Sequence, residues 1–119
     1  MKSFIEYLAE QDLDIDSGIQ MFLKIANDSL LKGEMAQLNK DRNKKFVAKK
    51  LRKYTAIYNE EFGKITSIHA FIDNATGDLL KPAGFKAPAK GARGNITNPD
   101  FMQKLKSRFD PYGSYLYAR

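Results

Sequence analysis

The residues of this chain whose types and spacing point most clearly to chemistry are its lysines and arginines. Between Lys40 and Lys53 there are eight bases and one acid, Asp41. Clustered cations of this kind neutralise phosphate groups and release the counterions that condense on a nucleic acid. Contact with phosphate needs only positive charge within reach, so the cluster predicts affinity for polyanions and not the reading of a base sequence. A solvated helix face without a binding role is the alternative that the same charges allow.

A second basic segment, residues 81–95, carries four bases and no acid among its glycines and prolines. Glycine lets a backbone approach a phosphate closely, and Phe85 is a candidate for stacking on a base. The alternative is a connection that packs over the sheet with Phe85 as its anchor. With both segments, the predicted nucleic-acid-binding residues are Lys44, Lys45, Lys49, Lys50, Arg52, Lys53, Lys86, Lys90 and Arg93.

The sequence has few residues that could support catalysis, metal binding or nucleotide binding by a phosphate loop. The chain has no cysteine and a single histidine, His69, which leaves little for thiol catalysis, a histidine-pair metal site or a serine–histidine arrangement. The phosphate-loop pattern G-x-x-x-x-G-K-[ST] is absent, and the acidic run that starts at Asp12 lacks the glycine and glutamate of a calcium loop. A carboxylate pair such as Asp73 and Asp78 stays open. We therefore expect no metal, no cofactor and no enzyme activity, and a strand position for His69 with a hydrogen-bonding neighbour.

The charge of the chain is polarised. Its 119 residues carry a net charge of +6, but residues 1–38 hold three bases and seven acids, whereas residues 39–119 hold 17 bases and seven acids. This asymmetry indicates a polyanion or a charged partner surface, or two parts that pack with complementary charge. The length predicts a single domain over residues 1–119, with an acidic helical part (1–38) and a basic part (39–119). No apolar run approaches the roughly 20 residues that span a bilayer, so we expect no membrane and a cytoplasmic protein.

The elements that position these residues are predicted from periodicity and capping signals. Ser3 and Glu6 have the capping-box spacing, which predicts a helix over residues 3–10. Apolar residues at helical spacing predict a second helix over residues 17–31. Residues 34–54 contain no glycine or proline and are rich in helix formers, so they predict a third helix that carries its charge outward.

The period then changes to that of a sheet. Residues 54–59 and 65–73 flank Gly63 and predict a hairpin, and the turn over residues 73–78 leads into a third strand. Pro82 must end this strand or move it to the edge of the sheet. Residues 82–95 suit neither a helix nor a central strand, and extended or polyproline-like backbone fits them. Asn98 and Pro99 predict the start of a C-terminal helix. The predicted fold is α+β, with N-terminal helices, a three-stranded antiparallel meander and a C-terminal helix.

The segment 65–117 resembles a group of small uncharacterised proteins from tailed bacteriophages. The similarity lies in the Ala-Thr-Gly-Asp turn at residues 75–78 and in the segments 81–86, 87–90 and 92–95, which read KPAGFK, APAK and ARGN. The resemblance implies a phage gene product that acts in a bacterial cytoplasm or is carried in a virion. It assigns no role to any residue.

Two functions follow from these observations. We expect a non-enzymatic phage accessory protein that binds DNA or RNA largely without sequence specificity. The alternative is a protein-interaction module, either an inhibitor of a host enzyme or defence factor or a minor virion component. In that case the acidic helices or the C-terminal tyrosines, Tyr112, Tyr115 and Tyr117, would form the contact surface.

Overall fold

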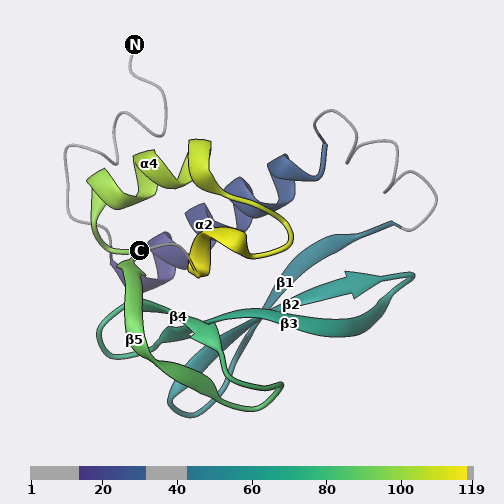
Figure 1. The fold of residues 1–119 in the computed structure, drawn as a ribbon, viewed down its shortest axis with the longest axis horizontal. Helices are drawn as coiled ribbons and strands as arrows, with labels where there is room; N and C mark the ends of the chain where they lie inside the picture. Colours follow the sequence, from purple (N-terminus) through teal and green to yellow (C-terminus); the bar gives the residue numbers. More distant parts are fainter. Residues whose placement is uncertain (1–13, 32–42, 118–119) are drawn as a thin grey trace.

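The computed structural model describes residues 14–31 and 43–117, and its centre is a five-stranded antiparallel sheet in the order β1-β2-β3-β4-β5. The strands are β1 (Lys45–Lys50), β2 (Tyr54–Glu61), β3 (Lys64–Asp73), β4 (Asp78–Pro82) and β5 (Pro88–Asn95). Two helices, α2 (Ile15–Ser29) and α4 (Pro99–Arg108), pack on one face of the sheet, and a short 3-10 helix, η1 (Ser114–Leu116), follows α4 (Figure 1).

The predicted fold class is therefore wrong. The sheet has five strands instead of three because residues 45–50 and 88–95 form strands at its two edges. The described part of the predicted helix 34–54 forms β1, a turn and the start of β2. The helix predicted over residues 3–10 lies outside the described residues.

Pairing with β2 explains why residues 45–50 form a strand. Phe46 is buried in the core under the helices, whereas the next residue, Val47, packs against a cluster on the other face. Adjacent apolar residues that face opposite sides are typical of a strand with cover on both faces. The Asn27 side chain of α2 also bonds the outer edge of this strand, since its Oδ1 accepts from the Phe46 N–H at 2.7 Å and its Nδ2 donates to the Phe46 carbonyl at 3.2 Å.

Residues 88–95 have the extended backbone that was predicted, but they pair with β4 as an edge strand, which the predicted three-stranded meander did not include. The glycines of this segment do not interrupt the strand. One makes room for a side chain of α4, and another allows a backbone conformation with positive φ. A Cβ on Gly94 would lie 2.2 Å from the ring of Phe101, so the missing side chain makes room for α4 to pack on the strand. Gly91 has φ +97°, a conformation that glycine adopts without strain. Pro88 is the first residue of its strand, where a missing N–H is tolerated.

Both described helices begin at capping residues, but the cap of α2 is Asp14 and not Asp16 or Ser17, the residues at which the sequence predicts it. The Asp14 side chain accepts a hydrogen bond from the Ser17 N–H at 2.7 Å, and this bond lowers the pKa of Asp14. Helix α2 thus begins two residues before the predicted position. Asn98 caps α4 and Pro99 is its first residue, which confirms the predicted start of the C-terminal helix.

The predicted hairpin and turn in the centre of the sheet are also confirmed. Strands β2 and β3 pair across Phe62 and Gly63, which both have positive φ, +53° and +78°. Asp73 holds the next turn, because its carboxylate accepts from the N–H groups of Ala75 and Thr76. Pro82 is the last residue of β4.

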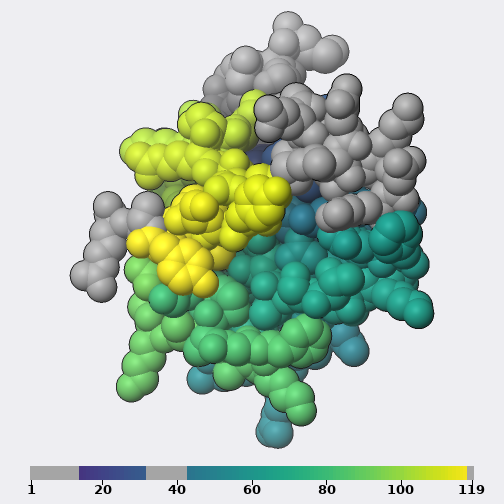
Figure 2. All heavy atoms as spheres, turned by 45° about the vertical axis from the view of Figure 1, so that its right-hand side comes forward, coloured from purple at the N-terminus to yellow at the C-terminus, as the bar shows by residue number. Residues whose placement is uncertain are grey.

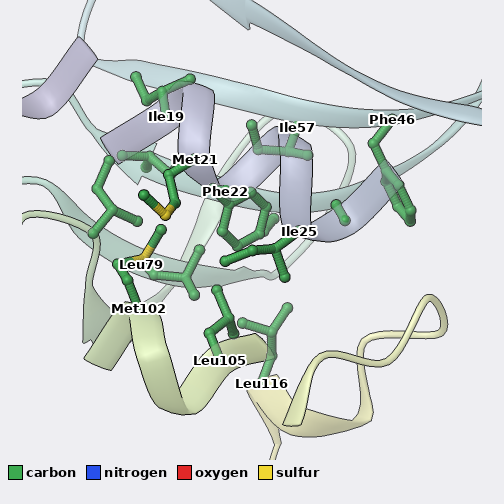
Figure 3. Packing of buried hydrophobic residues seen from close by; sticks show 14 of the residues in the cluster. Ile19, Met21, Phe22, Ile25, Phe46, Ile57, Leu79, Met102, Leu105 and Leu116 are labelled. Atoms are coloured by element: carbon green, nitrogen blue, oxygen red, sulfur yellow. The ribbon is translucent and has the colours of Figure 1, made fainter. Parts of the chain in front are cut away.

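The core lies between the two helices and the sheet. Phe22 and Ile25 of α2, Ile57 of β2 and Leu105 of α4 are among its buried residues, and they converge from all three elements (Figure 3). Gly18 lets α2 approach the chain after β5, because a Cβ there would lie 2.5 Å from the Ile96 carbonyl oxygen. The site residues are therefore displayed on a packed two-layer scaffold.

Candidate nucleic-acid interface

The basic residues of β1 and the following turn are mostly exposed and lie on both faces of an edge strand. Lys45 and Lys49 lie opposite Glu60 and Ala56 of β2, so they share the sheet face that the helices leave uncovered. Lys50 lies opposite Thr55 and faces the helix side. Among the described residues, the ion pair that these lysines make is between Lys45 and Glu60, at 3.5 Å.

Arg52 and Lys53 lie in the turn between β1 and β2. Both are exposed, and the Nζ of Lys53 lies 5.4 Å from the ring centroid of Tyr54, which belongs to the cluster on the uncovered face. Lys44 lies before β1, with its Nζ 5.8 Å from the Tyr112 ring. Lys53 therefore joins the uncovered face, while Lys44 lies beside the C-terminal segment.

The turn between β4 and β5 carries Phe85 to this same uncovered face. The Phe85 ring stacks on Tyr58 of β2, with a centroid distance of 5.4 Å and an interplanar angle of 29°, and Phe85 remains 51% exposed. Tyr58, Ala56 and Phe71 form the buried cluster beneath it. Phe85 thus anchors the turn over the sheet, as one of the two interpretations of the sequence expects, while about half of its surface stays exposed.

We call this surface the open sheet face and define it by Lys45, Lys49, Lys53, Tyr54 and Phe85. Lys86, exposed, follows Phe85 in the same turn. In Figure 1 the β1–β2 turn and the β4–β5 turn both lie on the side of the sheet away from α2 and α4, although they close opposite ends of the antiparallel strands. In Figure 2 the blue side chains of the β1 region protrude beside the green β4–β5 hairpin. The fold therefore places the bases Lys45, Lys49 and Lys53 on the sheet face that also carries the exposed ring of Phe85, which lies about 35 residues further along the chain.

The other predicted bases, Lys90 and Arg93, lie elsewhere. They line a groove of about 820 Å³ between β5 and α4, together with Arg108 and the apolar side chains of Phe101, Leu105 and Tyr115. Strands β1 and β5 are the two edges of the sheet, so this β5–α4 groove is separate from the open sheet face. The predicted set of nine bases does not form one continuous surface.

Sequence reasoning missed Arg108 as a member of this groove. The signal was present, since Phe101, Leu105 and Arg108 have the spacing of residues on one side of a helix. What the sequence did not show is that β5 exists and runs beside that side of α4.

His69 is a buried core residue on β3, and its predicted hydrogen-bonding neighbour is present. Its Nε2 lies 2.7 Å from the Tyr115 hydroxyl, and its ring contacts Phe46 and Phe109. Burial lowers the pKa of His69 to about 4, with a smaller contribution from the nearby Lys44 charge. The same burial raises the pKa of Tyr115. Both groups are therefore neutral at pH 7, and the pair fixes the C-terminal segment on the sheet.

A smaller polar pocket of about 220 Å³ lies between β3 and the C-terminal segment. Asn59, Ser67 and His69 line it, and the Asn59 Nδ2 donates to the Ser67 hydroxyl at 3.0 Å. The Asn59 Oδ1 is buried and has no hydrogen-bond partner among the described residues. A pocket of this size suits a few ordered water molecules, which can satisfy such an oxygen.

The fold and these surfaces define a class: a small antiparallel-sheet protein with helices on one face and two separate basic surfaces. The chain belongs to a family of unknown function, DUF7717, whose model matches residues 4–118. No curated protein and no solved structure matches the chain. Within residues 14–31 and 43–117, no helix has the length and apolar character needed to cross a membrane.

Proposed function

We propose that this protein binds nucleic acid through the open sheet face, without enzymatic activity and largely without sequence specificity. The observation that supports the proposal is one half-exposed aromatic ring, Phe85, on a sheet face that also carries Lys49 and Lys53. Sheets that bind single strands combine the same two features, an aromatic platform for the bases and cations for the backbone.

The two features are expected to act on different parts of the ligand. Lysines at the strand edge neutralise phosphates, which gives affinity that depends on salt and not on sequence. A stacked base gains about 1–3 kcal/mol on an aromatic ring, and only an unpaired base can reach it. The protein is therefore expected to prefer single strands over duplexes.

The test is fluorescence anisotropy with labelled single-stranded and double-stranded DNA and RNA at two salt concentrations. Phe85→Ala is expected to weaken single-strand binding about tenfold and to leave duplex binding nearly unchanged. The double variant Lys49→Gln/Lys53→Gln is expected to reduce the salt dependence, by about 0.7 in log–log slope for each lost contact with a single strand. Lys106→Gln on α4 removes one positive charge away from this face and serves as the control for the effect of each lost charge. Absence of binding to every polymer at low salt would refute the proposal.

We further infer that the protein is a phage accessory protein of the bacterial cytoplasm, which rests on the resemblance of residues 65–117. The inference is tested by finding the protein in infected cells and by assaying purified virions for it. A chain encoded and expressed outside any phage genome would contradict it.

A specific observation also favours the alternative, a protein-interaction module. Tyr112 and Tyr117 in the C-terminal segment are 72% and 57% exposed, and tyrosine is enriched at protein interfaces. A pull-down from nuclease-treated host lysate tests this alternative. It predicts a specific host protein that wild-type chain captures and Tyr117→Ala does not, whereas equal capture by both would count against it.

A further inference from the structure

The β5–α4 groove has the composition of a site for an anion. Lys90 and Arg93 on β5 and Arg108 at the end of α4 all line it, and no acidic side chain is found among the described residues that do so. Three like charges around one groove repel one another. A bound anion removes this repulsion.

Arg93 supplies a second and independent observation. Its Nε is buried, and no acceptor for this atom exists among the described residues. A buried donor of a charged group that lacks an acceptor is unfavourable, because it has lost its water without gaining a partner. The guanidinium group presents its donors in a planar fork that fits the oxygens of a phosphate or a carboxylate. Arg93 lines the groove and is half-buried, so its guanidinium group is well placed to hold an oxyanion there.

The floor of the groove is apolar and held in place. Phe101 packs against the bare backbone of Gly94, and Leu105 is buried in the core. Tyr115 is fixed by its hydrogen bond with His69. Two aromatic rings that cannot easily move provide a surface for a flat group of the ligand, and the volume of about 820 Å³ is within the usual range for small-molecule sites.

We propose that the β5–α4 groove binds a nucleoside monophosphate unit, with the phosphate on Arg93 and Arg108 and the base against Phe101 and Tyr115. This chemistry has two sources, a free nucleotide or the 5′-phosphorylated end of a strand. A bare phosphate would leave the aromatic floor uncovered, and an uncharged nucleoside would leave the three cations unpaired. The site lies apart from the open sheet face, so the proposal does not rest on the proposed function.

The test is a titration of ¹⁵N-labelled protein followed by NMR, with AMP, adenosine, inorganic phosphate and a pair of short oligonucleotides that differ only in a 5′-phosphate. We expect AMP to shift the amide signals of residues 90–93 and 101–108 and to bind at least about tenfold more tightly than adenosine or phosphate. Arg108 is exposed, so Arg108→Gln is expected to keep the fold and to weaken AMP binding about tenfold. Lys106→Gln on the same helix lies outside the groove and is expected to change the affinity less than twofold.

The two oligonucleotides distinguish the sources. If the 5′-phosphorylated strand binds the groove more tightly than AMP and than its 5′-hydroxyl partner, the ligand is a strand end; if AMP binds at least as tightly, it is a free nucleotide. Absence of shifts in these amides with both AMP and the phosphorylated strand overturns the proposal, as does equal weakening by Arg108→Gln and Lys106→Gln. Because Lys49→Gln/Lys53→Gln is expected to leave AMP binding intact, failure of this site and failure of the open sheet face give different results.

Discussion

The buried His69 makes a sharp prediction about pH. Its pKa is about 4 in the folded protein, against an ordinary value of 6.5, because burial disfavours the charged ring. Lys44 adds to this effect, and Asp110 and a hydrogen bond with the Pro111 backbone oppose it. In the unfolded chain the ring is exposed and takes up a proton near pH 6.5. Between these two values the unfolded state binds more protons, so the folded state loses stability as the pH falls.

The size of the effect follows from the two pKa values. Each pKa unit corresponds to about 1.4 kcal/mol, and His69 is 5% exposed, so solvent screens the interaction little. Relative to pH 7, the free energy of unfolding is expected to fall by about 2 kcal/mol at pH 5 and about 3 kcal/mol at pH 4 through this one residue. Above pH 7 the ring is neutral in both states and makes no further contribution.

The assay is urea unfolding of the wild-type protein and of His69→Gln at pH 7, 6, 5 and 4. Glutamine does not titrate and can still bond the Tyr115 hydroxyl, so the difference in unfolding free energy between the two proteins isolates the histidine. Carboxylates titrate in both proteins and cancel from this difference. We expect the stability advantage of the wild type to shrink steadily from pH 7 to pH 4. A difference that stays constant over this range would refute the view that His69 is buried in its neutral form.

Three further predictions concern the scaffold, and urea unfolding measures each of them. Gly18→Ala is expected to lower the unfolding free energy by about 1–3 kcal/mol, because its Cβ would meet the Ile96 carbonyl oxygen at 2.5 Å; a gain of stability, as helix propensity alone predicts, would contradict this packing. Phe62→Asn is expected to raise stability by about 1 kcal/mol, since asparagine tolerates the φ of +53° at this exposed turn better; no gain would mean that the turn is not strained. Asn98→Ala is expected to lower stability by about 1 kcal/mol through loss of its hydrogen bonds to Asp100 and Phe101, whereas an unchanged value would show that the cap contributes nothing.

The sequence predicts the elements whose signals are local. Asn98 and Pro99 mark the start of α4, the apolar spacing marks α2, and Gly63 lies in a hairpin that the structure confirms. In each case the residues that specify the element are within a few positions of one another. Local backbone preference and the final structure agree there.

The two edge strands could not be predicted in the same way because their signals are long-range. Residues 45–50 are good helix formers, and the turn that follows them contains no glycine, proline or asparagine to mark a hairpin. They form a strand because β2 pairs with them and because Phe46 and Val47 both find cover. In residues 88–95, Gly94 weakens the local strand signal but is needed for contact with Phe101. This contact forms only once α4 packs on β5, so it leaves no local pattern in the sequence.

The errors in the edge strands affect where the predicted basic residues lie in the fold, but not which kinds of residue were predicted to bind. The bases of the open sheet face and two of the three bases of the groove, Lys90 and Arg93, were identified from charge and glycine content, whereas Arg108 was not. Their division between an open face and a groove depends on the course of β1 and β5 at opposite edges, which composition does not encode. Arg108 joins Lys90 and Arg93 only because that course brings β5 alongside α4.

The paired hydrogen bonds between Asn27 and Phe46 have a consequence for how this protein behaves in a crowded cell. An exposed edge strand offers free N–H and C=O groups to the edge of any other sheet, which is a common route to aggregation. On β1 the Asn27 amide occupies one such N–H and C=O pair as a neighbouring strand would, and lysines surround the rest of the edge. Helix α2 thus covers the core and, through Asn27, also blocks part of the β1 edge from pairing with a strand of another molecule. A strand protected in this way can keep its basic side chains in solvent without recruiting further copies of the chain.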